Sequence, residues 1–445
     1  MTVKNVSHSV RAGLVTAITL AAVMGLGVSG AVAEATTSAG TWGAAQEIPG
    51  TAALNAGGSG GLSSVSCPSA GNCGAGGGYT DGLGHAQAFV VDETGGTWGT
   101  AQEVPGTAAL NVGGSDEIDS VSCPSAGDCS AGGQYLDGSG HSQAFVVSEA
   151  GGTWGAAQEV PGTAALNIGG FAVIDSVSCP SARACGAGGY YVDGSGHSQA
   201  FVVNQTNGTW GTAQEVPGTA ALDSGGLAQL DSLSCASAGN CSAGGKYTRH
   251  VGHSQAFVVS ERNGTWRTAR EVPGSGTLNV GRFAGVGSVS CASAGNCAAA
   301  GFYRDGSGHS QAFVVNQTNG TWGTAQEVPG TAALNAGGLA VPGSVSCASA
   351  GNCSAGGGYT DGSGHNQAFV VNETNGTWGT AEEVPGTATL NVGGFADITV
   401  VSCAPAGNCS AGGSYTDSSG HNQAFVVNQS STSRARSEHD TDADR

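Results

Sequence analysis

The chain has 445 residues, of which 80 are glycine and only 10% are charged, and its formal net charge at pH 7 is −19. An acidic protein of this kind lacks the basic stripe that phosphate binding requires, so nucleic acid is not expected as a partner. The glycines recur beside Val, Phe, Tyr and Trp, which predicts many tight turns rather than a disordered chain.

Residues 1–33 are predicted to be a secretory signal peptide. Lys4 and Arg11 precede an apolar run over 12–28, and Ala31 to Ala33 supply the small residues that a signal peptidase recognises. The alternative is a retained membrane anchor, but an apolar run of about 17 residues that contains glycine is short for a span. We therefore expect a secreted, extracellular protein with no membrane attachment after cleavage.

A repeat of 56 residues, the spacing between Cys67 and Cys123, fills most of the remaining chain. Seven tryptophans, seven pairs of cysteines and seven of the histidines recur at this spacing. One unit begins SVSCPSAGDC at Ser120 and continues AGGQY at Ala131. A fixed period of this order is the signature of a solenoid, a propeller or an array.

Within the unit that starts at Asp119 we expect four antiparallel strands, no helix and short turns. The expected strands cover 119–123, 130–136, 142–149 and 153–162. In the third strand, Phe145 and Val147 should face one side of the sheet, with Ala144 and Val146 on the other. The small residues of the second strand should let neighbouring sheets approach closely. A longer connector leads to the next unit.

Residues 34–429 are therefore predicted to form an all-β, seven-bladed β-propeller of four-stranded antiparallel blades. Residues 40–50 carry only a fourth strand, and the last unit stops after its third strand at 423–428. We expect these two fragments to close the ring by pairing the N-terminal strand with the last blade, whereas an open solenoid would need distinct caps. The polar tail, 430–445, is expected to be disordered. The DGSGH loops and the connectors should share one face, with the cystine turns on the other.

The cysteines form seven C-x5-C pairs, which in an exported protein indicates a disulfide framework. Zinc ligation is the alternative, but structural zinc sites have closer pairs and four ligands. The expected disulfides join Cys67 to Cys73, Cys123 to Cys129, Cys179 to Cys185, Cys235 to Cys241, Cys291 to Cys297, Cys347 to Cys353 and Cys403 to Cys409.

The candidate ligand-binding residues are the aspartate and histidine of each DGSGH loop, with Arg249 in place of the aspartate in the fourth unit. They are Asp81, His85, Asp137, His141, Asp193, His197, Arg249, His253, Asp305, His309, Asp361, His365, Asp417 and His421. The alternative is that these residues, copied into every blade, serve as loop hydrogen bonders. No catalytic residue, metal or cofactor is predicted, because the repeated glutamates occur singly and no serine lies in a GxSxG context.

Basic residues gather in units three to five. They are Arg183, Lys246, Arg249, Arg262, Arg267, Arg270, Arg282 and Arg304. Such a sector could be a docking patch for an anionic cell-envelope polymer or an acidic protein, and neutralising Arg249, Arg267 and Arg270 together should then weaken binding. The alternative is drift on a solvated surface after duplication.

The motifs SCPSAGNC, DGSGH followed by QAFVV, and NGTW resemble repeats of exported, largely uncharacterised proteins of high-GC Gram-positive bacteria. The segment around GHSQAF is similar to extracellular repeats named for a His-Ala-Phe motif. The resemblance covers 40–428 and implies an extracellular location without an established activity. NGTW also lies where sialidase-type Asp-boxes lie, and the Gly-Gly and Trp pattern is similar to kelch repeats, but the spacings differ and no catalytic residue is carried over.

Seven closely similar blades favour a non-catalytic binding or scaffold protein, because equal sites can engage a repetitive polymer with avidity. The expected partner is a cell-envelope or environmental carbohydrate, or another extracellular protein, and the chain is expected to be a monomer. The alternative is a secreted propeller enzyme acting on carbohydrate, a glycosidase or a lyase, with one asymmetric site.

Overall fold

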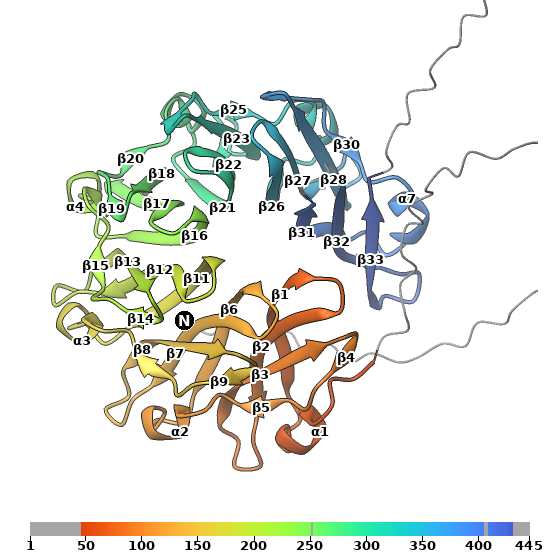
Figure 1. Cartoon of the computed structure of the whole chain (residues 1–445). Helices are drawn as coiled ribbons and strands as arrows, with labels where there is room; N and C mark the ends of the chain where they lie inside the picture. Colours follow the sequence, from red (N-terminus) through yellow and green to blue (C-terminus); the bar gives the residue numbers. More distant parts are fainter. Residues whose placement is uncertain (1–45, 251, 405–407, 430–445) are drawn as a thin grey trace, which may run out of the picture. The chain divides into compact units, whose positions relative to one another are not determined.

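The computed structural model describes residues 46–250, 252–404 and 408–429. The predicted signal peptide, most of the predicted N-terminal strand at 40–50 and the predicted tail lie outside these residues, so ring closure stays a prediction. From Pro49 onward the chain forms one compact unit. This unit is an all-β, seven-bladed β-propeller (Figure 1), as the repeat predicts. Among the described residues, no helix is long and apolar enough to cross a bilayer.

The first strand of each blade is innermost (Figure 1), and from blade 1 to blade 6 it contacts the first strand of the next blade. The first strands are β1 (Gly60–Ser69), β6 (Asp116–Ser125), β11 (Ala172–Ser181), β16 (Ala228–Ser237), β21 (Ala284–Ser293), β26 (Ala340–Ser349) and β31 (Ala396–Cys403). They are longer than predicted because the end of each connector joins the strand. We number the blades 1 to 7 in this order.

In each blade the second strand pairs antiparallel with the first, and the third pairs antiparallel with the second. The second strands are β2 (Asn72–Thr80), β7 (Asp128–Leu136), β12 (Ala184–Val192), β17 (Asn240–His250), β22 (Asn296–Arg304), β27 (Asn352–Thr360) and β32 (Cys409–Thr416). The third strands are β3 (Ala86–Thr94), β8 (Ser142–Ala150), β13 (Ser198–Thr206), β18 (His253–Arg262), β23 (Ser310–Thr318), β28 (Asn366–Thr374) and β33 (Asn422–Asn428).

The predicted fourth strand is present in blades 1 to 6 but is broken into two short pieces. The pieces are β4 (Thr97–Trp98) and β5 (Gln102–Glu103), β9 (Thr153–Trp154) and β10 (Gln158–Glu159), β14 (Thr209–Trp210) and β15 (Gln214–Glu215), β19 (Thr265–Trp266) and β20 (Arg270–Glu271), β24 (Thr321–Trp322) and β25 (Gln326–Glu327), and β29 (Thr377–Trp378) and β30 (Glu382–Glu383). Trp98 pairs with Glu93, but Gln102 pairs with Val90, so the outer strand holds one extra residue. An extra residue of this kind is a β-bulge, which bends the strand and interrupts its pairing.

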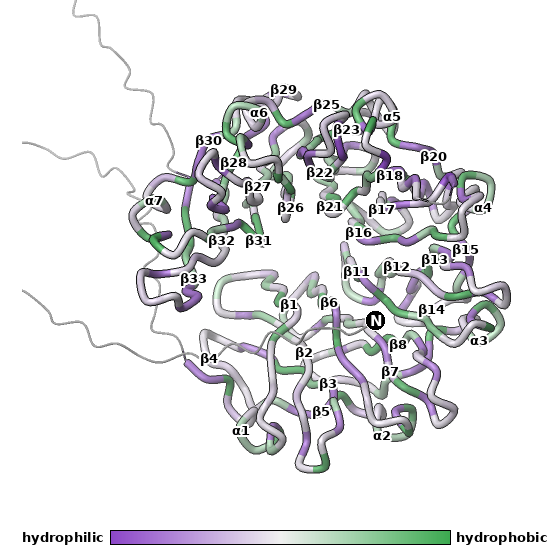
Figure 2. The backbone as a smooth tube through the Cα atoms, turned by 180° about the vertical axis from the view of Figure 1, so that it is seen from behind, coloured by the Kyte–Doolittle hydropathy of each residue, from purple (hydrophilic) through white to green (hydrophobic). Residues whose placement is uncertain are grey.

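The connectors contain single helical turns, which the sequence analysis did not predict. They are α1 (Thr51–Leu54), α2 (Thr107–Leu110), α3 (Thr163–Leu166), α4 (Thr219–Leu222), α5 (Ser275–Leu278), α6 (Thr331–Leu334) and α7 (Thr387–Leu390). One turn is too short to show a helical period in the sequence. These turns lie at the outer edge of the blades (Figure 2).

Paired backbone bonds confirm the predicted division of the loops between two faces. The N–H of Gly113, in a connector, donates to the carbonyl of Leu136 at the start of a DGSGH loop (2.9 Å). On the other face, the N–H of Gly152, in the turn before Trp154, donates to the carbonyl of Gly127 in the cystine turn (2.8 Å). We call these the loop face and the cystine face.

Serine hydroxyls join the innermost strands of neighbouring blades. Ser64 Oγ accepts the N–H of Val121 and Ser66 Oγ accepts the N–H of Cys123, each at 2.9 Å. Equivalent bonds of 2.9 to 3.1 Å recur at the following boundaries. In blades 1 to 5 the two serines that flank the valine or leucine before the first cysteine bind the next blade, and in blade 6 the second one, Ser346, does so; we call this set of bonds the serine ladder.

The apolar core lies between blades, with alternate residues of the third strand facing opposite sides as predicted. Phe145 and Val147 pack in one cluster with Ala88 and Val90 of blade 1. Ala144 and Val146 pack in another cluster with residues of blade 3. A Cβ at Gly132 would come within 2.6 Å of a methyl group of Ile174 in blade 3. This confirms the prediction that the small residues of the second strand let neighbouring sheets approach closely.

All seven predicted disulfides are formed, with Cα atoms 3.9 to 4.1 Å apart. Each one joins the first two strands of a blade, and those of blades 2 and 4 also pack on the preceding blade: a Cβ at Gly74 would lie 2.6 Å from Cys123 Sγ, and one at Gly186 would lie 2.9 Å from Cys235 Sγ. The zinc alternative fails, because no free cysteine is left in the described chain.

Removing two hydrogen bonds of the serine ladder should destabilise the protein. In the double variant Ser232→Ala/Ser234→Ala, the N–H groups of Val289 and Cys291 lose their hydroxyl partners. A buried donor left unpaired costs about 1–3 kcal/mol, so the free energy of unfolding should fall by at least about 2 kcal/mol in denaturant titration. The control Ser139→Ala, at an exposed loop serine, should change it by less than about 0.5 kcal/mol. Equal effects would contradict the role of the ladder.

Candidate functional site

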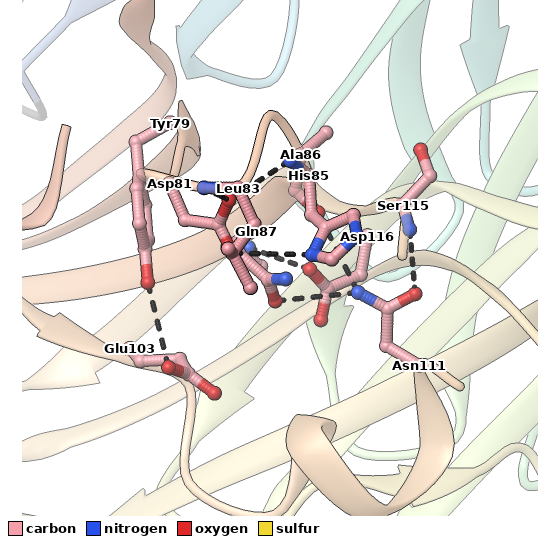
Figure 3. Close-up of polar contacts among 11 residues, drawn as sticks. Tyr79, Asp81, Leu83, His85, Ala86, Gln87, Glu103, Asn111, Ser115 and Asp116 are labelled. Atoms are coloured by element: carbon pink, nitrogen blue, oxygen red, sulfur yellow. Dashed lines mark hydrogen bonds and ion pairs between the residues drawn. The ribbon is translucent and has the colours of Figure 1, made fainter. Parts of the chain in front are cut away.

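The predicted ligand-binding aspartates lie on the loop face and shape their own turns. Asp81 Oδ1 accepts the N–H groups of His85 at 2.9 Å and Leu83 at 2.8 Å (Figure 3). The bond from His85 is the main cause that lowers the pKa of Asp81. The same pair of bonds recurs at Asp137, Asp193, Asp305, Asp361 and Asp417. These aspartates are turn formers first, as the alternative interpretation expected.

The histidines of these loops pack on the connector to the next blade. A Cβ at Gly114, where φ is +78°, would lie 2.8 Å from Cδ2 of His85. The same relation holds between the next histidines and connector glycines, namely His141 and Gly170, His197 and Gly226, His309 and Gly338, and His365 and Gly394. Glycine leaves room for the ring and adopts the positive φ without strain, whereas the equivalent residue after blade 4 is Arg282, with φ +69°. The histidine side chains, 48% to 54% exposed in blades 1, 2, 3 and 5, keep an accessible edge.

Two further repeated residues have structural contacts. Asn111 of the connector donates to Gln87 Oε1 at 3.3 Å and accepts the N–H of Ser115 at 2.7 Å, so it ties a connector to a third strand (Figure 3). Glu103 accepts the Tyr79 hydroxyl at 3.4 Å, and burial, followed by this carboxylate, raises the pKa of the tyrosine to about 12. The repeated glutamates of the QEVPG motif thus bind tyrosines within their own blades.

The loop of blade 4 departs from this pattern. Because Arg249 replaces the turn-forming aspartate, the strands β17 and β18 extend into the loop and His250 pairs with His253. The Arg249 side chain is 61% exposed, and its Nη1 lies 3.9 Å from Glu271 Oε2. The sequence already identified this loop as an exception. The structure shows that it differs from the other loops in its backbone as well as in its charge.

Cationic side chains surround this loop on the loop face. The N–H of Ser254, next to His253, donates to the carbonyl of Arg282 at 2.9 Å. Partial burial, then the charges of Arg282 and His250, lower the pKa of His253. Arg304 of blade 5 places its guanidinium 5.7 Å from the ring of Phe283, which is itself 42% exposed. We define the cationic patch as Arg249, His250, His253, Arg282, Phe283 and Arg304.

The other basic residues of the predicted sector lie elsewhere. Arg183 and Arg262 donate to carbonyls of turns on the cystine face. Arg270 is next to Glu271 in β20, so it faces the opposite side of the strand from the carboxylate that Arg249 approaches. Arg267 lies between the two pieces of the outer strand, β19 and β20, and its N–H donates to the carbonyl of Ser260 at 2.9 Å. The trio Arg249, Arg267 and Arg270 therefore does not form one surface, and the patch is built from Arg249, Arg282 and Arg304.

Three aspartates lie on the innermost strands of blades 2, 3 and 4, at the bulge of each strand. They are Asp119, Asp175 and Asp231. Burial and then the neighbouring carboxylates raise the pKa of Asp175 to about 8, and burial followed by Glu117 raises that of Asp119 to about 7. Asp231 is 3.1 Å from Lys246 Nζ. One carboxylate oxygen of Asp119 and one of Asp175 are buried without a hydrogen-bond partner among the groups described.

Sequence reasoning missed these inner carboxylates, although comparing the copies at one position would have found them. The residues at that position are Ser63, Asp119, Asp175, Asp231, Gly287, Gly343 and Thr399. Another acidic residue, Asp116, occurs at its position in one copy only; it is 1% exposed and accepts the N–H of Ala88 at 2.8 Å. Burial raises its pKa to about 6. The copies differ at positions on the innermost strands, where neighbouring blades meet. A search for residues that repeat in every copy does not detect such positions.

No protein-family model matches this chain, and no curated protein sequence matches it. A puromycin-hydrolysing peptidase of Mycobacterium tuberculosis is similar in structure at 12% identity and a TM-score of 0.44, with 87% of this chain and 54% of that chain covered. A protein of unknown function from Dyadobacter fermentans is similar at 10% identity and a TM-score of 0.39, with 83% of this chain and 94% of that chain covered. A sialidase variant from Streptococcus pneumoniae is similar at 10% identity and a TM-score of 0.34, with 84% of this chain and 68% of that chain covered. At these TM-scores no residue, substrate or activity is transferred to this chain.

Replacing Asp175 by serine, the residue of blade 1, should stabilise the protein at alkaline pH. The folded protein holds a proton on Asp175 that the unfolded chain, with its ordinary pKa of 3.8, releases. The carboxylate therefore costs stability progressively as the pH rises from about 4 to about 8. Asp175→Ser should gain about 1–3 kcal/mol at pH 8 and little at pH 4 in denaturant titrations.

The control for this prediction is Asp231→Ser. It removes an equivalent carboxylate but leaves Lys246 without its partner, so it should stabilise less than Asp175→Ser at pH 8. A gain for Asp175→Ser that does not depend on pH would contradict the assignment of the effect to ionisation.

Proposed function

We propose that this chain is a secreted, non-catalytic binding protein that recognises an anionic carbohydrate polymer through the cationic patch. The observation that carries the proposal is the exception in blade 4, where Arg249 replaces a turn-forming aspartate, and Arg282 and Arg304 flank the altered loop. The export expected from residues 1–33 and the seven disulfides support an extracellular location.

The chemistry of the patch suits carboxylate or phosphate groups on a sugar chain. Guanidinium groups present planar pairs of donors that match these anions, and Arg249, Arg282 and Arg304 are all exposed. Phe283 adds an exposed apolar ring of the kind on which a sugar ring can pack, and its position under the guanidinium of Arg304 holds that arginine in place.

The rest of the loop face favours one such site over seven equal ones. In blades 1, 2, 3, 5, 6 and 7 the loop aspartate already accepts two backbone N–H groups, so its binding capacity is largely used within the loop. These loops are also acidic, and they would repel an anionic polymer. The net charge of −19 therefore directs an anionic ligand to the cationic patch.

The triple variant Arg249→Gln/Arg282→Gln/Arg304→Gln should lose binding to anionic polymers. We expect polygalacturonate or poly(glycerol phosphate) to bind the oxidised wild-type protein with strong salt dependence, and neutral dextran not to bind. If each exposed charge contributes up to about 1 kcal/mol, calorimetry should show a loss of about tenfold or more in affinity.

The matched control is Arg267→Gln/Arg270→Gln, which removes nearby positive charges outside the patch. It should bind the same polymers nearly as well as the wild type. Binding of dextran and the anionic polymers with equal affinity, or equal losses in both variants, would overturn the proposal.

A carbohydrate-active enzyme is the second candidate, and the inner carboxylates favour it. Asp119 and Asp175 lie on neighbouring blades, and their raised pKa values are in the range that a general acid requires near neutral pH. Release of reducing ends from any polymer that binds, abolished by Asp175→Asn, would support this function over the non-catalytic one.

A further inference from the structure

A pair of hydrogen-bonded polar side chains crosses each of the four boundaries from blade 2 to blade 6 on the cystine face, near the end of the third strand. At the boundary of blades 2 and 3, Gln205 Nε2 donates to Ser148 Oγ at 2.8 Å, and at that of blades 4 and 5, Gln317 donates to Ser260 Oγ at 2.7 Å. At the boundaries of blades 3 and 4 and of blades 5 and 6, an asparagine donates to a glutamate. These pairs are Asn204 with Glu261 and Asn316 with Glu373. Each pair matches a donor with an acceptor.

The boundary of blades 1 and 2 breaks this rule. The equivalent residues are Asp92 and Glu149, so two carboxylates face each other. Asp92 Oδ2 accepts the indole N–H of Trp154 at 2.8 Å. Asp92 Oδ1 and both oxygens of Glu149 are buried and have no hydrogen-bond partner in the described part of the chain. Glu149 is only 3% exposed, so water cannot readily solvate its charge.

The unpaired oxygens converge on one place. Ligand atoms of Asp92, Glu149 and Cys129 all lie within 4.8 Å of one another. Cys129 is oxidised in the disulfide with Cys123, so its sulfur is no thiolate ligand and the available ligands are carboxylate oxygens. A cavity of about 80 Å³, lined by Asp92 and Glu149 among others, adjoins the pair and has room for an ion with bound water.

A third acidic residue adds to the negative charge at this boundary. Asp128 stands in the cystine turn of blade 2, where most other copies have asparagine. Burial, then the charges of Asp92 and Asp128, raise the pKa of Glu149 to about 7. Buried carboxylate oxygens without donors, here Asp92 Oδ1 and both oxygens of Glu149, are costly unless a positive charge lies beside them.

We propose that Asp92 and Glu149 bind a divalent cation, Ca²⁺, and that this ion joins blades 1 and 2, whereas the four boundaries from blade 2 to blade 6 use a hydrogen bond. Hard oxygen ligands select Ca²⁺ over softer metals, and Ca²⁺ tolerates irregular coordination completed by water. Three unpaired protein oxygens make a weak site, of the kind that extracellular modules fill at dissociation constants of about 10⁻⁴–10⁻³ M. The site lies on the face opposite to the cationic patch, so it is independent of the proposed function.

Terbium luminescence tests the site, because Tb³⁺ replaces Ca²⁺ at oxygen ligands and Trp154, bound to Asp92, can sensitise it. Excitation of tryptophan in the full oxidised chain should give Tb³⁺ emission that Ca²⁺ displaces, with one ion per chain. Ca²⁺ at millimolar concentration should also raise the midpoint of thermal unfolding.

Variants designed on the other boundaries make the test specific. Asp92→Asn rebuilds the Asn–Glu pair of blades 3 and 4, so the protein should stay folded but lose the emission and the response to Ca²⁺. The control Glu261→Gln removes a buried glutamate at the equivalent position of blade 4 and should keep both. Emission that persists in Asp92→Asn would overturn the proposal.

A shared proton is the other way to reconcile the two carboxylates. In that case the wild type would show no displaceable Tb³⁺ emission, and the midpoint of unfolding would not respond to Ca²⁺ at pH 7.5. It would fall as the pH rises from 5 to 8, and this fall would be smaller in Asp92→Asn. That result would reject the cation and assign the pair to a proton.

Discussion

The serine ladder is the contact on which the propeller depends. Neighbouring blades meet at innermost strands whose outward N–H groups cannot pair with a strand of the next blade, because the strands belong to different sheets. A hydroxyl on a short side chain bridges that distance, as Ser64 does for Val121 and Ser66 for Cys123. A longer side chain would separate the blades, and an apolar one would leave the N–H groups unpaired. This explains why SVSC recurs with so little variation.

The other features that are repeated in each unit also stabilise the contact between neighbouring blades. The second strand consists of small residues because an isoleucine, leucine or valine of the next blade packs on it, and the disulfides of blades 2 and 4 pack on the preceding blade. On the loop face, the histidine of one loop rests on the glycine of the next connector. Repetition of the sequence therefore reflects repetition of the boundary, and a residue that differs between copies marks a boundary with a different chemistry.

The differing residues carry opposite charges in different parts of the ring. The acidic ones, Asp92, Asp119 and Asp175, lie in blades 1 to 3, where burial raises their pKa values, and Asp92 meets Glu149, which is itself a repeated residue. The basic ones that form a surface, Arg249, Arg282 and Arg304, are exposed on blades 4 and 5. The repeat thus supplies a uniform scaffold, and the exceptions supply the groups with binding capacity.

The sequence by itself determined the propeller, its strands, its seven disulfides and the two faces, because each depends on local patterns that the period of 56 residues repeats. It also identified Arg249 as an exception. It did not show the helical turns, which are too short to leave a period, or the bulge that splits the fourth strand. The tertiary structure alone decided which exceptions meet. Asp92 and Glu149 are 57 residues apart, and Asp119 and Asp175 are one full repeat apart, so only packing of successive blades brings their charges together.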